Sequence, residues 1–342
     1  MERNHRFFQL DSLRGIAAFV VMLHHYFAIY DRDFKHNFFV PPVFMYGFYG
    51  VELFFIISGF VIYYTLHYCR TAGDFLIKRF IRLFPTYWLC VCITFLAITC
   101  FPLSAFRDTT WKDALVNMTM LNGLVGVKGV DPSYWSLQPE LFFYLLMTFL
   151  FFTRLSKYLY TCLWVWLGLI LFYNLVHKIP VAGAFLNLKY GSLFIAGICF
   201  YKIKVEKDLS LQALFLLIAS YVCTLVVLRD LEGVYGSITI VYLLFICALF
   251  CKMKIFSWKA LIFLGNISYA LYLIHQNIGF IIIRQTILWT GISGPEVVIL
   301  PIIISILLAW LITYYFEKEV ISRLKRLLLT NKTKGASEKW AY

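Results

Sequence analysis

Residues 10–30 form an apolar stretch that contains ionisable side chains. The stretch reads LDSLRGIAAFVVMLHHYFAIY and is long enough to cross a bilayer as a helix. It carries Arg14 near its start and His24 and His25 near its end. Arg14 and His25 are separated by close to three helical turns, so their side chains share a face with a rise of about 16 Å between them. Because ionisable groups inside a membrane helix are costly, this pattern indicates a functional site.

His25 is the residue of this stretch best suited to acid–base chemistry. A neutral imidazole in a partly dry site can take a proton from a hydroxyl near neutral pH. His24 points about 100° away around the helix, so the two histidines do not serve the same group. The alternative is a structural histidine in the core or at the interface, but the alignment with Arg14 favours function. On a straight helix Asp11 is too far away to orient His25, so either the helix breaks or another residue does so.

Arg79 and Arg82 lie three residues apart in the segment HYCRTAGDFLIKRFIR, on one face if this segment is helical. Guanidinium groups suit phosphate oxygens because they can bind them with two parallel hydrogen bonds. The pair is therefore a candidate phosphate site. The alternative is the positive charge that orients membrane proteins and attracts anionic lipid, and the spacing alone favours this alternative.

Two carboxylates begin apolar runs. Glu140 follows Trp135, Ser136 and Pro139. It could orient an imidazole, accept hydrogen bonds from sugar hydroxyls, or simply favour the dipole at a helix start. Glu52 lies in the glycine-rich stretch MYGFYGVELFFIISGF, where the glycines favour close packing of helices and the role of the carboxylate stays open.

His275 lies in the stretch NISYALYLIHQNI, on the same helical side as Ser268 and Tyr272. Such a face either lines a polar cavity or makes hydrogen bonds between helices. The nine cysteines show no metal or redox spacing and are interpreted as packing residues, so no metal site is predicted. The sequence also lacks the serine-hydrolase elbow, the Walker lysine motif, the zincin motif and a periodic arginine row.

The composition places these residues in a membrane protein. Of 342 residues 61% are hydrophobic and only 14% are charged, which is typical of an all-α polytopic membrane protein. Apolar runs predict about ten transmembrane helices. They cover residues 10–30, 46–66, 83–103, 135–152, 159–176, 188–203, 209–228, 234–251, 260–283 and 297–316.

The formal net charge of +13 arises largely from basic residues in short loops between these runs. That distribution indicates membrane orientation and contact with membrane lipids, and it argues against nucleic-acid binding. The excess of lysine and arginine on alternate loops predicts that both termini are cytoplasmic. We expect a membrane domain over residues 1–320 and a basic, partly disordered cytoplasmic tail over residues 321–342.

Five segments together resemble the acyltransferase-3 family of integral membrane acyltransferases. They are LDSLRGIAAFVVMLHHY, ELFFIISGFVI, KRFIRLFPTYWL, YWSLQPELFFYL and ISYALYLIHQNI, and they occur in the family's order. The resemblance covers most of residues 8–152 and returns at 260–280. It implies a ten-span enzyme of the bacterial inner membrane that moves an acyl group, usually acetyl, from cytoplasmic acyl-CoA to a hydroxyl of an extracytoplasmic glycan.

The family's motifs fall on residues already noted. Its Arg-x10-His motif matches Arg14 and His25, with its aspartate on Asp11, and its Arg-x-x-Arg and Trp-Ser-Leu-x-x-Glu motifs match 79–82 and 135–140. Combining this resemblance with the residue patterns, we predict His25, Glu140 and Asp11 as catalytic residues, Arg14, Arg79 and Arg82 as donor-binding residues, and Trp135, Ser136, Glu52 and His275 as acceptor-binding residues. Many relatives have a second acidic residue where this chain has Leu141, so a role that needs paired carboxylates is not expected there.

Together these expectations give one mechanism. The arginines hold the phosphates of acetyl-CoA at the inner face, the pantetheine arm follows residues 10–30, and the thioester reaches His25. His25 then acts as general base or accepts the acyl group transiently. No permanently bound cofactor is expected, since acetyl-CoA is a substrate. The acceptor is a glycan such as O-antigen or another surface polysaccharide, free or lipid-linked.

Two other functions compete with this one. A secondary transporter of an acyl group or a lipid-linked sugar would also explain polar groups in the membrane, but the sequence shows no paired repeats with interrupted helices. A non-catalytic partner in polysaccharide assembly would leave the alignment of Arg14 and His25 unexplained.

Overall fold

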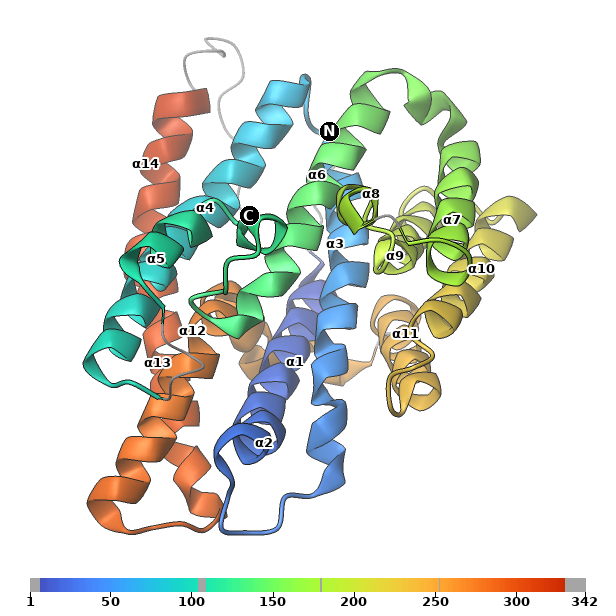
Figure 1. Cartoon of the computed structure of the whole chain (residues 1–342). Coiled ribbons are helices and arrows are strands. Elements are labelled where there is room, and N and C mark those ends of the chain that lie inside the picture. Colours follow the sequence, from blue (N-terminus) through green and yellow to red (C-terminus); the bar gives the residue numbers. More distant parts are fainter. Residues whose placement is uncertain (1–6, 104–108, 179, 252, 330–342) are drawn as a thin grey trace.

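The computed structural model describes residues 7–103, 109–178, 180–251 and 253–329, and all regular elements in these ranges are helical (Figure 1). The α-helices are α1 (Phe8–His24), α2 (Tyr30–Phe34), α3 (Gly50–Leu66), α4 (Ala72–Cys100), α5 (Trp111–Asn117), α6 (Leu137–Phe152), α7 (Leu159–Leu175), α8 (Pro180–Phe185), α9 (Gly191–Lys204), α10 (Leu211–Val227), α11 (Val234–Phe250), α12 (Lys259–Thr290), α13 (Ile299–Leu311) and α14 (Lys318–Leu329).

Membrane-spanning length is reached by seven helical stretches of the described chain. They are Phe8–Phe34, Pro42–Leu66, Ala72–Cys100, Pro132–Phe152, Leu155–Leu175, Lys259–Thr290 and Pro295–Leu328, and α10 and α11 are shorter apolar helices. The prediction of an all-α polytopic membrane protein is therefore confirmed. The sixth predicted span corresponds to α9, which has 14 residues. The side of the membrane on which the termini lie stays a prediction, and of the predicted tail only residues 321–329 are described, as part of α14.

Helix α1 lies in the middle of the bundle, between α3 and α12 (Figure 1). Two glycines bring the backbones of α1 and α12 into contact. A Cβ atom on Gly265 would lie 1.9 Å from the carbonyl oxygen of Asp11, and one on Gly15 would lie 2.4 Å from the carbonyl oxygen of Leu261. Helices approach this closely only where no side chain stands between them. The crossing holds the helix that carries Arg14 against the helix that carries His275.

Replacing Gly265 by alanine should therefore destabilise the protein. The added methyl group has no space against the Asp11 backbone, and overpacking of this kind costs about 1–3 kcal/mol or more. The measurement is the thermal unfolding midpoint of the detergent-solubilised protein. Gly168→Ala is the matched control, because nothing lies within 4 Å of a Cβ atom at Gly168 in α7. Equal midpoints for the two variants would contradict the close crossing.

The prediction that the glycines in 45–60 allow close packing of helices is confirmed. A Cβ atom on Gly59 would lie 2.2 Å from the Phe194 carbonyl oxygen in α9. Cβ atoms on Gly47 and Gly50 would lie 2.7 and 2.8 Å from carbonyl oxygens of α1. Helix α3 is thus packed closely between α1 on one side and α9 on the other.

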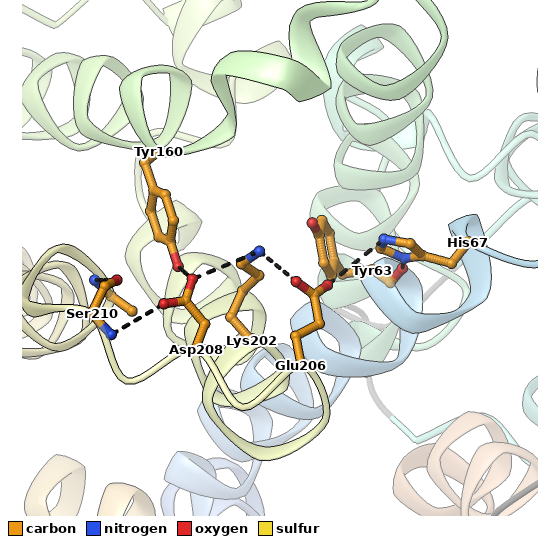
Figure 2. A network of polar contacts seen from close by, with 8 residues as sticks. Tyr63, His67, Tyr160, Lys202, Glu206, Asp208 and Ser210 are labelled. Atoms are coloured by element: carbon orange, nitrogen blue, oxygen red, sulfur yellow. Dashed lines mark hydrogen bonds and ion pairs between the residues drawn. The ribbon is translucent and has the colours of Figure 1, made fainter.

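A polar network joins one end of α3, α7 and α9 (Figure 2). The Nζ atom of Lys202 lies 2.5 Å from a carboxylate oxygen of Glu206 and 3.8 Å from one of Asp208. Asp208 accepts a hydrogen bond from the Tyr160 hydroxyl, and Glu206 lies 3.8 Å from the His67 ring. The network fixes helix ends away from the residues proposed for chemistry, so we interpret it as structural.

Replacing Tyr160 by phenylalanine removes the hydrogen bond from its hydroxyl to Asp208. The stability of this helix end should fall by only about 0.5–1 kcal/mol, because Tyr160 and Asp208 are partly exposed and solvent screens their interaction. Hydrogen bonds from Tyr160, and to a lesser extent from Ser210, lower the pKa of Asp208 in the folded protein. The ionised Asp208 carboxylate therefore stabilises the fold above about pH 4. This stabilisation is lost as the pH falls through the folded-state pKa. The unfolding midpoints of variant and wild type should converge in acid. Tyr158→Phe is the control, because Tyr158 is exposed. A difference in unfolding midpoint between Tyr160→Phe and wild type that persists or grows in acid would contradict the role of the Tyr160–Asp208 hydrogen bond.

Candidate functional site

The predicted site residues gather in two places, and the first is the end of α1. Helix α1 ends at His24, and residues His25–Ile29 continue it as a π-helical turn. Such turns alter the direction in which side chains point and are frequent at functional sites. His24 turns toward the segment before α3, where its Nδ1 atom lies 2.8 Å from the Phe44 carbonyl oxygen. His25 is half-buried and faces α12, and its ring still contacts that of His24 edge to face, with the ring centroids 5.3 Å apart.

His25 is paired with His275 of α12. The Nε2 atom of His275 lies 3.1 Å from Nδ1 of His25, and the ring centroids are 4.8 Å apart. Nδ1 of His25 also lies 2.8 Å from the Val21 carbonyl oxygen. Asp11 is at the other end of α1, so His275 is the residue that orients His25. We call His25 and His275 the histidine pair.

The hydrogen bonds of the pair determine which nitrogens carry protons. Nδ1 of His275 lies 2.8 and 3.1 Å from the carbonyl oxygens of Tyr272 and Leu271, which can only accept, so this nitrogen donates. In the neutral ring Nε2 of His275 then accepts from Nδ1 of His25. Nδ1–H of His25 also suits the Val21 carbonyl oxygen. Neutral His25 is thus left with its lone pair on Nε2, the state required of a base or a nucleophile.

His275 is 1% exposed and is held from several directions. The Tyr26 hydroxyl donates to its carbonyl oxygen at 2.9 Å. Two residues further on, the backbone N–H of Asn277 donates to the carboxylate of Asp131 at 3.0 Å. Asp131 is fully buried and also accepts from the backbone and side chain of Ser133. The segment before α6 is therefore fixed to α12 beside the histidine pair, and Asp131 places a negative charge near it.

Ser136 and Trp135 lie on the short helical turn Pro132–Ser136, and Ser136 is connected to the pair through Tyr272. The Oγ atom of Ser136 is 2.7 Å from the Tyr272 hydroxyl, which donates to the Ser133 carbonyl oxygen at 2.9 Å. Trp135 is 46% exposed, and its ring centroid is 5.3 Å from that of Tyr190. Of the predicted acceptor residues, Trp135 thus offers an accessible surface, whereas His275 contacts His25 through one ring nitrogen and the backbone through the other.

The second place is an arginine group, formed by Arg14, Arg79 and Arg82. Arg14 lies 3.7 Å from Asp11 and is close enough to Arg82 and Glu140 to interact electrostatically. Asp11 is therefore a partner of Arg14 and not of His25. The arginines of α1 and α4 thus form one positive region, as their predicted common function requires.

Glu140 belongs to the arginine group and not to the histidine pair. Its Oε1 atom accepts hydrogen bonds from the Tyr144 hydroxyl at 2.5 Å and from Ser58 at 3.1 Å. It also interacts electrostatically with Arg14 and Arg82. This geometry suits positioning of the arginines, a role that was not among the alternatives predicted for Glu140.

Arg79 and Arg82 have different partners. Arg82 is paired with the buried Glu317 and lies 5.5 Å from the Tyr269 ring centroid. The guanidinium of Arg79 packs on the rings of Phe75 and Tyr144, at 5.3 and 5.6 Å. Its buried Nε atom has no hydrogen-bond partner among the described residues. Arg79 also borders a largely apolar cavity of about 200 Å³ between α4 and α6. Arg79 therefore retains hydrogen-bonding capacity for a ligand.

Several residues of the site are not predicted from the sequence. Lys325 of α14 interacts electrostatically with Arg82 and Lys78 and so extends the arginine group. The sequence feature that could have pointed to Lys325 was the basic, amphipathic character of the chain end. Glu317 could also have been found from the sequence, because it is an ionisable residue at the end of an apolar run. Asp131 begins a turn with Pro132, which the sequence marks only as a loop.

Comparisons with known proteins identify the family of the chain. An acyltransferase domain family matches residues 7–314, which is most of the chain. A protein named "Putative acetyltransferase ORF330", from Acidianus two-tailed virus, is 26% identical over 284 residues, covering 78% of this chain and 82% of that protein. No solved structure matches the chain.

Proposed function

Because this chain belongs to the acyltransferase-3 family of membrane acyltransferases, we propose that it transfers an acetyl group from acetyl-CoA to a glycan hydroxyl. The observation that carries the proposal is that α1 carries Arg14, a member of the arginine group, and the paired imidazole of His25 about 16 Å further along. A donor with phosphates at one end and a thioester at the other suits this arrangement. The proposed setting is the cytoplasmic membrane of a bacterium, with the acceptor on the outer side.

The donor binds first through its phosphates. Arg79 contributes the guanidinium whose Nε lacks a partner in the described chain, while Arg14 and Lys325 add positive charge around Arg82. Charge-assisted hydrogen bonds to phosphate are among the stronger polar contacts in proteins. Glu140 and Asp11 act as positioning residues, since they hold Arg14 and the side chains around it.

The chemical step takes place at Nε2 of His25. This nitrogen removes the proton of the acceptor hydroxyl as the hydroxyl oxygen attacks the thioester carbonyl, so that a C–O bond forms. The C–S bond then breaks, and the CoA thiolate takes the proton from His25. An ester and free CoA are the products. A route in which Nε2 carries the acetyl group transiently needs the same protonation state and the same histidine pair.

The His275 variants test the role of the pair. His275→Ala should lower kcat about 10- to 100-fold and leave the KM for acetyl-CoA unchanged, because His25 loses the group that fixes its tautomer. His275→Gln should recover part of the rate, since its side-chain carbonyl oxygen can accept from Nδ1 of His25. The readout is CoA thiol release. Equal rates for the alanine variant and the wild type, or a changed KM with kcat intact, would remove His275 from the mechanism.

The proposed function itself is tested with purified protein in proteoliposomes. Acetyl-CoA is supplied with a surface polysaccharide preparation, and free CoA thiol and polysaccharide acetyl content are both measured. Acceptor-dependent thiol release with an equal gain in acetyl ester is the expected result. Movement of acetyl-CoA or sugar across the membrane without thiol release would show a transporter and overturn the proposal.

A further inference from the structure

A cavity of about 230 Å³ lies between the first turns of α6 and α9, the end of α7 and α8. Resting on the proposed function, we propose that this cavity is the acceptor subsite and that it binds a pyranose carrying an anionic group. Its volume is below the roughly 300 Å³ at which sites for drug-sized ligands begin, so it suits one sugar ring. Its lining includes polar side chains of Gln138, Asn187 and Lys189 and the rings of Tyr173 and Tyr190.

A chain of contacts connects the cavity to the histidine pair. The Tyr190 ring in the cavity wall is 5.3 Å from the Trp135 ring. Trp135 adjoins Ser136, whose Oγ is 2.7 Å from the Tyr272 hydroxyl, and the Tyr272 ring is 5.8 Å from that of His275. A ring held against Tyr190 is therefore linked to His275 through the intervening side chains of Trp135, Ser136 and Tyr272.

The aromatic rings suit a sugar. Trp135 is 46% exposed and Tyr190 is half-buried, so both rings offer apolar surface to the C–H groups of a pyranose. Small-molecule sites typically combine aromatic surfaces with a small number of polar groups, and these polar groups determine how the ligand is oriented. The amide of Gln138 provides both a donor and an acceptor for ring hydroxyls.

Glu52 lies between the cavity and the histidine pair. It is 2% exposed and interacts electrostatically with Lys189 and Tyr190 on one side and Tyr272 on the other. Its Oε2 atom has no hydrogen-bond partner within the described residues. A buried oxygen of this kind is costly unless a donor reaches it. Glu52 does not line the cavity itself, so its part at this place is electrostatic, through Lys189 and Tyr190 of the cavity wall.

Lys189 determines the preferred charge of the ligand. Its Nζ atom is exposed at the cavity, 5.2 Å from the Tyr190 ring centroid. No carboxylate of the described chain is within salt-bridge distance of it. A carboxylate or phosphate on the sugar can therefore pair with Lys189. A carboxylate would belong to an acidic sugar, and a phosphate to a sugar phosphate such as that of a lipid-linked acceptor.

Binding is measured by saturation-transfer NMR with three probes: p-nitrophenyl β-D-glucuronide, glucose 1-phosphate and the neutral p-nitrophenyl β-D-glucoside. The expected result is that wild type binds at least one anionic probe more tightly than the neutral one. Lys189→Gln should weaken anionic binding about 10-fold and leave the neutral probe unchanged, and Tyr190→Leu should weaken both. Preference for the glucuronide assigns an acidic sugar, and preference for glucose 1-phosphate assigns a sugar phosphate.

The exposed Lys112→Gln on α5 is the matched control and should change neither binding nor unfolding midpoint. Absence of binding by all three probes, or undiminished anionic binding in Lys189→Gln, would overturn the subsite. Failure of the proposed function looks different: the anionic probe binds and responds to the variants, but no CoA thiol is released from acetyl-CoA.

Discussion

Changing His25 to alanine should lower the rate of acetyl transfer by a factor of about 10³ or more, with the amount of protein in the membrane unchanged. The variant removes the nitrogen that takes the hydroxyl proton, and a positioned general base contributes about 10²–10⁴-fold. His25 is only half-buried and begins a π-helical turn, so its truncation leaves the crossing of α1 and α12 intact. The measurement is acceptor-dependent release of CoA thiol by purified protein in proteoliposomes.

The matched control is His177→Ala, because His177 is an exposed histidine after the end of α7. It should retain the wild-type rate. The KM for acetyl-CoA should be similar in His25→Ala and wild type, since the phosphates bind at the arginine group. Wild-type turnover by a His25→Ala protein would exclude the histidine pair as the reacting centre.

Changing Arg79 to alanine should raise the KM for acetyl-CoA about 10- to 100-fold and affect kcat much less. A hydrogen bond to a charged group contributes about 1.5–3 kcal/mol, and about 1.4 kcal/mol corresponds to a tenfold change in affinity. Arg79 is a sharper probe than Arg82. Loss of Arg82 leaves Glu317 buried without its partner and so adds a cost in stability. Initial rates over a range of acetyl-CoA concentrations give both constants.

Lysine at position 79 should restore only part of the affinity, because an ammonium group cannot form the paired hydrogen bonds of a guanidinium. Arg229→Ala, an exposed arginine between α10 and α11, is the control and should leave KM unchanged. An unchanged KM in both Arg79 variants would place the donor phosphates elsewhere.

The sequence was sufficient for much of this description. Composition and apolar runs predicted the all-α membrane fold. This prediction depends on local periodicity, which neighbouring residues determine. Because the rise of a helix is fixed, the sequence also predicted that either the helix breaks or a residue other than Asp11 orients His25. The resemblance of five segments identified the family, which the match over residues 7–314 shows.

The pairing of His25 with His275 could not be predicted, because it depends on a contact between α1 and α12. That contact requires Gly15 and Gly265 to meet, and neither glycine is informative alone. The position of Glu140 depends similarly on the depth at which α6 begins. The segment before α6 turns back against α12 through Asp131, which brings Glu140 to Ser58 and the arginines. The sequence showed only a polar loop before an apolar run.

The central claim is that one donor molecule reaches from the arginine group to His25. A cryo-EM structure with acetonyl-CoA, in which a ketone replaces the reactive thioester, tests it most directly. We predict the phosphates against Arg79 and Arg82 and the ketone carbonyl carbon within about 3.5 Å of the space where an acceptor oxygen meets Nε2 of His25. Density for the pantetheine arm that leads away from α1, with the ketone remote from His25, would contradict the account.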